Sequence, residues 1–313
     1  MPNGILTLWG YFGSKAKLAE RIADWLPYKE ITTFVDAFTG SCAITLNKPS
    51  HKHQICNDLN IKIFLVIRAL SEKETANEFI ARAFKTKYSK ECFDKAVDEW
   101  RKYDKQLKQF ISEMLKLTEY TPEAFEYANN KWKTIIPEDK EIEMAVYALV
   151  IFRQSFNGLG KDWKGIKDGD EGVAYENRLC NLRDIAEKLE GTEVYNVNAI
   201  MLINKFKDRA DVAFYNDSPY EFKTRGKKQS KSKHDYEIEM PDELQLKYID
   251  AIKDAKEKIV LSGFKRNGTS IYDVLVEEWG WKCIAFAETK KSAAVTKSGE
   301  AKPVDVEYVW YNY

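Results

Sequence analysis

Short apolar runs alternate with amphipathic segments along much of the chain. Apolar, β-prone runs occupy residues 33–38, 54–56, 193–197, 211–215 and 258–262. Segments with helical spacing of apolar residues follow, at 60–70, 198–206, 243–255 and 270–277. Buried strands that alternate with helices are typical of a parallel sheet covered by helices. The pattern therefore predicts an α/β fold built on one open, mostly parallel sheet.

Two regions depart from this alternation. Residues 71–190 are charged, aromatic-rich and helical in pattern, and we interpret them as an insertion with a small core of its own. Residues 1–70 and 191–313 then form the domain that carries the sheet. Near the end of the chain, the β-rich runs 281–286 and 306–311 are expected to pair as a hairpin.

Polar residues stand where the predicted strands end. Asn57 and Asp58 follow the second strand, and the tetrapeptide 217–220, Asp-Ser-Pro-Tyr, follows the strand at 211–215. The carboxyl ends of parallel strands meet at the edge where open α/β folds bind ligands. Asp58 stands about twenty residues beyond the first strand-to-helix turn, a spacing that suits an acid that accepts from ribose hydroxyls. The pattern indicates an adenosine cofactor site, with a plain α/β domain as the alternative.

A basic stretch follows the tetrapeptide directly. Residues 223–234 contain six lysines and arginines and no acid. The whole chain has 49 Lys plus Arg and 49 Asp plus Glu, so its net charge gives no general attraction to nucleic acid or membranes. A polyanionic substrate would have to be met by a local patch such as this one. The alternative is an ordinary solvated loop.

Two further segments have residue types that suit ligand binding. In Tyr11-Phe12-Gly13-Ser14-Lys15 a glycine turn leads into a helix, and a lysine at a helix amino terminus favours a carboxylate or phosphate. Residues 152–158 place Arg153, Gln154 and Asn157 between aromatic residues. These side chains match the usual readers of base edges, although a capped helix end is the simpler interpretation.

Composition narrows the possible classes of protein. The five cysteines are scattered, without the spacing of a zinc site or the density of a disulfide scaffold, which favours a reducing compartment. The sequence has no secretory signal pattern and no apolar run that approaches the length of a membrane span, so we expect a cytoplasmic protein without a membrane partner. His51 and His53 lack further ligands at suitable spacing, and we predict no metal site.

Taken in order, these motifs resemble the Dam-like (D12 class) adenine-specific DNA methyltransferases, and especially their phage and mobile-element branch. Tyr11 to Lys15 is similar to the amino-terminal motif of that family, and Phe38-Thr39-Gly40 to its cofactor loop. Asp217-Ser218-Pro219-Tyr220 is similar to its catalytic Asp-Pro-Pro-Tyr motif. The segments 236–240 and 261–264 also match. The resemblance covers nearly the whole chain.

The resemblance implies a Rossmann-like methyltransferase sheet with a helical target-recognition domain at 71–190. It implies S-adenosylmethionine as methyl donor and double-stranded DNA as partner, and we favour a monomer. The residues expected at the cofactor are Tyr11, Lys15, Asp36, Phe38, Gly40, Asp58, Asn198 and Asp217. The residues expected to be catalytic are Asp217, Ser218, Pro219 and Tyr220. The residues expected at the DNA are Lys223, Arg225, Lys227, Lys228, Lys231, Arg153 and Asn157.

The residue types of the tetrapeptide suit this reaction. The exocyclic N6 amine of adenine is a poor nucleophile because its lone pair is delocalised into the ring. Asp217 and the backbone carbonyl of Ser218 can each accept one N–H, which points the lone pair at the methyl group. The amine is inaccessible in a stacked duplex, so the base is expected to be flipped out and held on Tyr220.

Three residues differ from the usual family pattern. Ser218 replaces the first proline of the catalytic motif, Cys42 stands where a second glycine is common, and Asn198 stands where an aspartate is common. We expect Cys42 to add bulk near the methionine end of the cofactor. These differences leave three interpretations open: an ordinary adenine methyltransferase, an enzyme with a modified S-adenosyl donor, or a weakened homologue that mainly binds DNA. Methylation of RNA or of a small molecule is a further, less favoured class.

Overall fold

The computed structural model describes residues 5–10, 15–27, 29–166, 169–219, 238–290 and 304–313. These described residues form one sheet of seven strands in the order β3-β2-β1-β4-β5-β7-β6. The strands are β1 (Thr33–Asp36), β2 (His53–Asn57), β3 (Glu193–Tyr195), β4 (Val212–Asn216), β5 (Lys258–Phe264), β6 (Lys282–Lys290) and β7 (Val304–Tyr311). The predicted α/β fold is confirmed, and each predicted strand coincides with one of these seven.

Strand direction places the polar residues. Strands β1 to β5 pair in parallel, and Asp36 is in register with Cys56 of β2 and Tyr215 of β4. The residues just after these strands therefore meet at one edge of the sheet. Strand β7 is antiparallel to both β5 and β6, which confirms the predicted hairpin. Its first residues consequently lie beside the carboxyl end of β5, where Glu307 pairs with Phe264.

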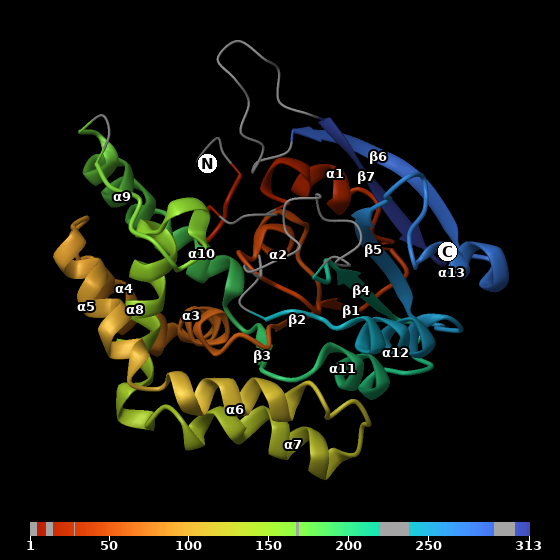
Figure 1. Cartoon of the computed structure of the whole chain (residues 1–313), viewed down its shortest axis with the longest axis horizontal. Coiled ribbons are helices and arrows are strands. Elements are labelled where there is room, and N and C mark those ends of the chain that lie inside the picture. The colour runs from red at the N-terminus through yellow and green to blue at the C-terminus, as the bar shows by residue number, and fades with distance from the viewer. Residues whose placement is uncertain (1–4, 11–14, 28, 167–168, 220–237, 291–303) are drawn as a thin grey trace.

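Helices cover both faces of the sheet, as Figure 1 shows. On one face lie α1 (Ala19–Ala23) and α2 (Ala43–Asn47), and on the other lie α3 (Ile61–Ser71), α11 (Ala199–Lys205) and α12 (Asp242–Ile252). Successive strand side chains point to opposite faces. Phe34 and Tyr215 accordingly join the core on the α1 side, while Val35 and Phe214 join the core on the α3 side. Helix α13 (Asp273–Trp279) precedes β6.

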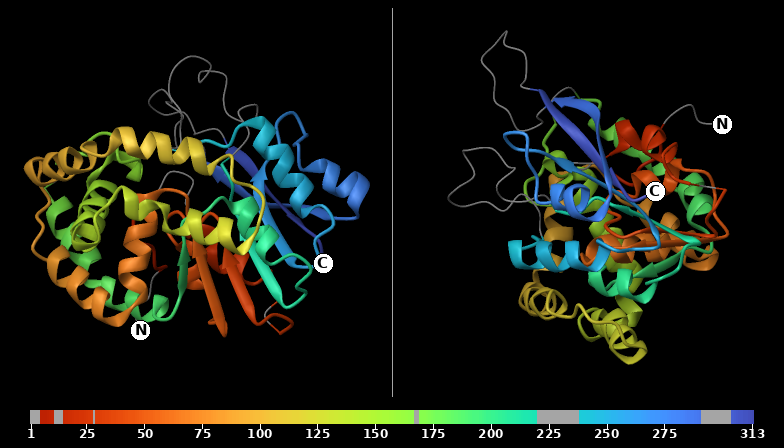
Figure 2. Two further views of the ribbon diagram at one scale, coloured as in Figure 1. Left: turned by 90° about the horizontal axis from the view of Figure 1, so that it is seen from below. Right: turned by 90° about the vertical axis from the view of Figure 1, so that its right-hand side faces the viewer.

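The described part of the predicted insertion is mainly helical. Its helices are α4 (Lys73–Ala83), α5 (Lys90–Arg101), α6 (Asp104–Met114), α7 (Pro122–Asn130), α8 (Glu141–Gln154), α9 (Glu171–Cys180) and α10 (Leu182–Leu189). They gather on the β3 side of the sheet in Figures 1 and 2. Helix α5 is typical, because Phe93, Ala96 and Trp100 recur at helical spacing and are buried.

The core of the insertion is continuous with that of the sheet. Helix α8 is buried from Met144 to Gln154 except at Tyr147, and its side chains belong to the same cluster as those of α3, Val35 and Phe214. The small core expected for residues 71–190 is therefore an extension of the core on one face of the sheet. No helix among the described residues is long and apolar enough to cross a membrane.

Candidate active site

A pocket opens at the carboxyl edge of the parallel strands. It encloses about 1090 Å³ of empty space, its open mouth included. Its walls come from the residues that follow β1, β2, β3 and β4, and from residues 238–244. Several residues that were expected to bind the cofactor or to be catalytic line this pocket: Lys15, Asp36, Phe38, Gly40, Asp58, Asn198, Asp217 and Pro219. Among the predicted residues alone, the pocket thus collects side chains separated by up to 204 positions in the sequence, from Lys15 to Pro219.

Asp36 places a buried carboxylate at the end of β1. The residue is 2 % exposed, and its Oδ2 accepts a hydrogen bond of 2.8 Å from Thr45 Oγ1. Its Oδ1 has no hydrogen-bond partner among the described residues. Burial raises the pKa of Asp36 to about 7. A buried acceptor without a partner at the wall of an open pocket suits a cationic or N–H group of a ligand.

The loop after β1 is held in a left-handed turn. Thr39 joins the ends of β1 and β2, because its hydroxyl bonds to the backbone of Asp36 and Asn57. Gly40 and Cys42 have φ values of 52° and 62°, a region that glycine adopts without strain. The family preference for glycine at position 42 therefore has a backbone cause.

The side chain of Cys42 does not face the pocket. It is fully buried in the core, where it lies beside Cys56, and it is not among the residues that line the pocket. The expectation that Cys42 adds bulk at the methionine end of the cofactor is therefore wrong. The backbone of the loop approaches the pocket and the thiol points away from it.

Asp58 is fixed by backbone N–H groups at the end of β2. Its Oδ2 accepts from Gly40 N at 2.9 Å, and its Oδ1 accepts from Asn60 N at 2.9 Å. The side chain of Asn57 connects the neighbouring strand ends, since it bonds to Ala37 O and to both backbone groups of Val197. These contacts hold the carboxylate of Asp58 in one orientation at the pocket wall.

Asn198 connects the pocket to the insertion. Its Oδ1 caps α11 by accepting from Ile200 N at 3.0 Å. Its Nδ2 donates to the carbonyls of Met114 and Leu115, both at 3.3 Å, at the carboxyl end of α6. The side chain amide therefore uses both ends in protein contacts. Its donors explain why an amide, and not a carboxylate, suits this position in this chain.

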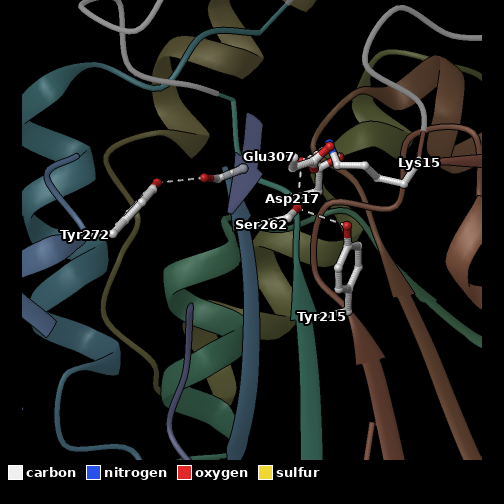
Figure 3. A network of polar contacts seen from close by, with 7 residues as sticks. Lys15, Tyr215, Asp217, Ser262, Tyr272 and Glu307 are labelled. Carbon is white, nitrogen blue, oxygen red and sulfur yellow. Dashed lines mark hydrogen bonds and ion pairs between the residues drawn. The ribbon is translucent and has the colours of Figure 1, made fainter. Parts of the chain in front are cut away.

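Asp217 lies at the centre of a charged cluster, shown in Figure 3. Lys15 Nζ donates to Asp217 Oδ1 at 2.8 Å and to Oδ2 at 2.9 Å. Lys15 Nζ also lies 3.1 Å from Glu307 Oε1 of β7, an ion pair without hydrogen-bond geometry. Ser262 Oγ donates to Asp217 Oδ1 at 3.2 Å, so Tyr215 donates its hydroxyl proton to Ser262. Four side chains thus fix the carboxylate of Asp217, two of them directly and two through these partners.

Burial and neighbouring charges act in opposite directions on the pKa values of Lys15 and Glu307. Burial alone would lower the pKa of Lys15, but the charges of Asp217 and Glu307 outweigh it and raise that pKa above its ordinary value. Burial raises the pKa of Glu307, and Asp217 adds to this effect while Lys15 opposes it. Lys15 and Glu307 are 5 % and 2 % exposed, whereas the side chain of Asp217 is 20 % exposed. Of the three, Asp217 is the group that a ligand can reach.

Ser218 and Pro219 form the turn after Asp217. Ser218 Oγ lies 2.9 Å from Tyr272 OH, which donates to Gln245 Oε1 at 2.7 Å. Gln245 Nε2 in turn donates to Pro219 O at 2.8 Å. Figure 3 shows Tyr272 pointing toward the Asp217 cluster from the far side of the turn.

The residues expected at DNA fall into three groups. Lys223, Arg225, Lys227, Lys228 and Lys231 lie outside the described residues, as do Tyr220 and Tyr11. Arg153 is 5 % exposed, and its Nε donates to Leu8 O at 2.8 Å. Burial lowers the pKa of Arg153 to about 10. Asn157 is exposed on a left-handed turn with φ of 53°. Asn157 therefore faces solvent, whereas Arg153 ties the amino-terminal segment to α8.

The site also contains residues that sequence reasoning missed. Ser262 donates to Asp217, and Thr45 donates to Asp36. Glu307 pairs with Lys15, and Tyr272 and Gln245 contact the turn at residues 218–219. Glu307 left one signal in the sequence, because it is a lone acid in the apolar run 306–311. The hydroxyl and amide residues left none, since such side chains are common on helices and strands of any protein.

Comparison with known proteins identifies the family. The model of the D12 class N6 adenine-specific DNA methyltransferases matches residues 11–273. The chain belongs to this family. The matched span begins in the amino-terminal motif, includes the insertion and ends at Asp273, whereas Glu307 lies beyond it. A comparison with curated proteins gave no match.

Membership in the family defines the reaction. An N6 adenine-specific DNA methyltransferase moves a methyl group from S-adenosylmethionine to the N6 amine of adenine in DNA. The methyl donor and the DNA substrate expected from the sequence agree with this family. Among the described residues, no group of three or more His, Cys, Asp or Glu side chains is placed to hold a metal ion.

Proposed function

We propose that this methyltransferase acts on an adenine flipped out of duplex DNA, with Asp217 and the backbone carbonyl of Ser218 as the groups that contact the reacting amine. The observation that carries the proposal is the fixed carboxylate of Asp217 at the pocket. Lys15 and Ser262 donate hydrogen bonds to this carboxylate, and the side chain of Asp217 is still 20 % exposed. A preorganised acceptor of this kind suits an N–H group that must be oriented.

The residues of the pocket fit S-adenosylmethionine. The unpartnered Oδ1 of Asp36 would accept from the ammonium group of the methionine part, and Asp58 would accept from the ribose hydroxyls. Gly40 allows the backbone to approach the donor, and Phe38 offers an apolar face. When bound, S-adenosylmethionine supplies an electrophilic methyl group on its sulfonium centre.

Asp217 and Ser218 prepare the amine for attack. Each accepts one N–H of the exocyclic group, so the nitrogen becomes pyramidal and its lone pair faces the methyl group. After transfer of the methyl group from the sulfonium centre, the amine nitrogen would carry one proton in excess. Asp217 would accept from this nitrogen, and it is the base that we assign to that proton. Lys15 and Glu307 do not touch the amine and act by holding Asp217.

We assign the DNA contacts to segments around the turn at residues 217–219 and to the insertion. We assign the base-stacking role to Tyr220 and phosphate contacts to Lys223, Arg225, Lys227, Lys228 and Lys231, all outside the described residues. The insertion, residues 71–190, is the proposed target-recognition domain, and residues 1–70 and 191–313 are the proposed catalytic domain. Asn157 is exposed and remains a candidate for base contact, whereas the burial of Arg153 favours a positioning role.

The three departures from the family pattern fit ordinary methylation. Cys42 points away from the pocket, Asn198 is used in a helix cap and a contact with the insertion, and the carbonyl of Ser218 does not depend on its side chain. No feature of the described residues favours a modified donor or DNA binding alone. An enzyme that modifies DNA meets its substrate in the cytoplasm of a bacterial or phage-infected cell, and we propose that it acts there as a monomer.

Transfer of a labelled methyl group tests the proposal. Protein, duplex DNA and S-adenosylmethionine labelled in the methyl group are incubated, and the label in DNA is counted. The wild type should label the DNA, and Asp217→Ala should lose the label while it still binds DNA in a mobility shift. Asp211→Ala is the matched control, because Asp211 stands at the other end of β4, where it bonds to Arg209 and Thr32. Equal labelling by wild type and Asp217→Ala would refute the assignment.

A further inference from the structure

We propose that Tyr272 and Gln245 are positioning residues for the methyl transfer, because a buried chain of hydrogen bonds through them fixes the turn at Ser218 and Pro219. The inference rests on the proposed function, in which the carbonyl of Ser218 contacts the reacting amine. It assigns a use to the serine that stands where the catalytic motif of similar enzymes has a proline.

The chain of hydrogen bonds has a defined direction. Tyr272 OH donates to Gln245 Oε1 at 2.7 Å, and a phenol has only one proton to donate. The contact of 2.9 Å between Ser218 Oγ and Tyr272 OH must then have Ser218 as donor. Gln245 Nε2 completes the chain by donating to Pro219 O at 2.8 Å. Hydrogen bonds that run in one direction polarise and strengthen one another.

This arrangement holds the turn from both sides. The side chain of Ser218 is tied at the start of the peptide between residues 218 and 219, and the carbonyl of Pro219 is tied just after it. The carbonyl of Ser218 lies between these two attachments. A proline at position 218 would restrict the backbone through its ring, whereas a serine leaves φ free. The hydrogen bonds of Ser218 and Pro219 therefore restrict the backbone of this turn, as the ring of a proline would at position 218.

Burial makes the chain of hydrogen bonds effective. Ser218, Tyr272 and Gln245 are 2 %, 3 % and 0 % exposed, so water does not compete for their polar groups. Gln245 lies on α12 and Tyr272 lies just before α13, so the turn is anchored to two separate elements. The ring of Tyr272 is itself held by an edge contact with Trp310, with centroids 5.6 Å apart.

A purely structural role would have a different effect from a positioning role. Loss of a buried hydroxyl lowers stability wherever it lies, because it leaves its partners without a hydrogen bond. Loss of a group that positions the reacting amine also slows the chemical step, since small displacements of reacting atoms have large effects on rate. The turnover number at saturating S-adenosylmethionine and DNA separates the two roles, and the melting temperature monitors stability.

Tyr272→Phe is the central variant, and Tyr175→Phe is its control. Tyr175 lies in the insertion, is 2 % exposed, and its hydroxyl lies 2.6 Å from Thr86 Oγ1. Tyr175→Phe therefore also removes a buried, hydrogen-bonded hydroxyl, as Tyr272→Phe does. We expect Tyr272→Phe to lower kcat by about tenfold or more with little change in KM for S-adenosylmethionine. Tyr175→Phe should lower the melting temperature by a similar amount and leave kcat unchanged.

Ser218→Ala provides a second variant in case Tyr272→Phe fails to fold, and the two substitutions together form a double-mutant cycle. Ser218→Ala should lower kcat as Tyr272→Phe does, and the double variant should be no slower than the slower single variant, because both remove the same contact. Additive losses, or a kcat within twofold of the wild type in both single variants, would overturn the inference. A wild type that transfers no methyl group would instead overturn the proposed function, and this inference with it.

Discussion

Lys15 Nζ lies 2.8 Å and 2.9 Å from the two carboxylate oxygens of Asp217, although 202 residues separate them in the sequence. Glu307 of β7 joins the same ammonium group at 3.1 Å. The amino-terminal segment, the end of β4 and the final hairpin therefore meet at one buried cation. The proposed catalytic carboxylate depends on both ends of the chain for its position.

Replacement of Lys15 by methionine should destabilise the protein. Lys15→Met leaves Asp217 and Glu307 as neighbouring acids without a cation, and removal of one partner from a buried ion pair costs about 3–5 kcal/mol. We expect the lower end of that range, since the side chain of Asp217 is 20 % exposed. Urea unfolding measures the change. The double variant Lys15→Met/Glu307→Gln should recover part of the loss, and equal stability of Lys15→Met and wild type would contradict the ion-pair cluster.

Glu307→Gln should slow catalysis without impairing DNA binding. With Glu307 neutral, Asp217 alone opposes the charge of Lys15, so its carboxylate becomes a weaker acceptor for the adenine amine. We expect kcat to fall by about tenfold, which corresponds to about 1.4 kcal/mol in the barrier. Single-turnover kinetics and a mobility shift give the two readouts. An unchanged kcat would show that Lys15 holds Asp217 equally well without Glu307.

The affinity for S-adenosylmethionine should depend on the ionisation of Asp36. Burial raises the pKa of Asp36 from 3.8 to about 7, and a bound ammonium group favours the ionised form. Affinity should therefore rise as the pH is raised toward 7, by up to about tenfold per pH unit while Asp36 is still protonated. Calorimetric titration between pH 5.5 and about 7.5 measures it. Asp36→Asn should bind more weakly and lose this dependence; a variant with the dependence of the wild type would rule out Asp36 as its source.

The raised pKa of Asp36 has the opposite effect on the stability of the protein without ligand, which should fall as the pH rises. A carboxyl whose pKa is raised on folding binds its proton more tightly in the native state, so its contribution to stability is largest at low pH. That contribution is lost as the pH rises from 3.8 through about 7. Relative to Asp36→Asn, the wild type should thus lose stability over this window, as urea unfolding at each pH would show.

Asn198→Asp should destabilise the chain, although aspartate is common at this position in similar enzymes. The new carboxylate can still cap α11, but it cannot donate to the carbonyls of Met114 and Leu115. One buried and one partly buried carbonyl would lose their donor and face a negative charge, a loss of about 1–3 kcal/mol. Asn198→Ser keeps the cap without adding charge and should lose less. Equal stability of Asn198→Asp and wild type would show that the contact with α6 contributes nothing.

The gathering of Asp58 and Asp217 could be predicted from the sequence, because each follows an apolar run and parallel strands deliver such residues to one edge. Asp36 lies inside the predicted run 33–38, and it was expected at the cofactor only from the family resemblance. The strand assignment therefore predicted the pocket without any knowledge of side chain contacts. The burial of Arg153 could have been predicted too, because it lies in the last turn of a helix whose apolar residues from 144 to 152 cover all sides, and such a helix is buried.

The partners of the catalytic turn could not be predicted in this way. Glu307 reaches Lys15 because β7 runs antiparallel to β5 in a register that pairs Glu307 with Phe264. That register is set by the packing of the whole sheet. Tyr272 and Gln245 reach Ser218 and Pro219 through single tertiary hydrogen bonds, which have no period in the sequence. Cys42 was expected at the pocket because a motif gives the position of a residue and not the direction of its side chain.

The mass of the modified nucleosides tests the central claim most directly. The protein is incubated with S-adenosylmethionine and DNA of mixed sequence, the DNA is digested to nucleosides, and the products are separated and weighed. We predict deoxyadenosine with one added methyl group at N6, and no such product with Asp217→Ala. Unmodified deoxyadenosine after incubation with the wild type, or an adduct heavier than a methyl group, would contradict the account.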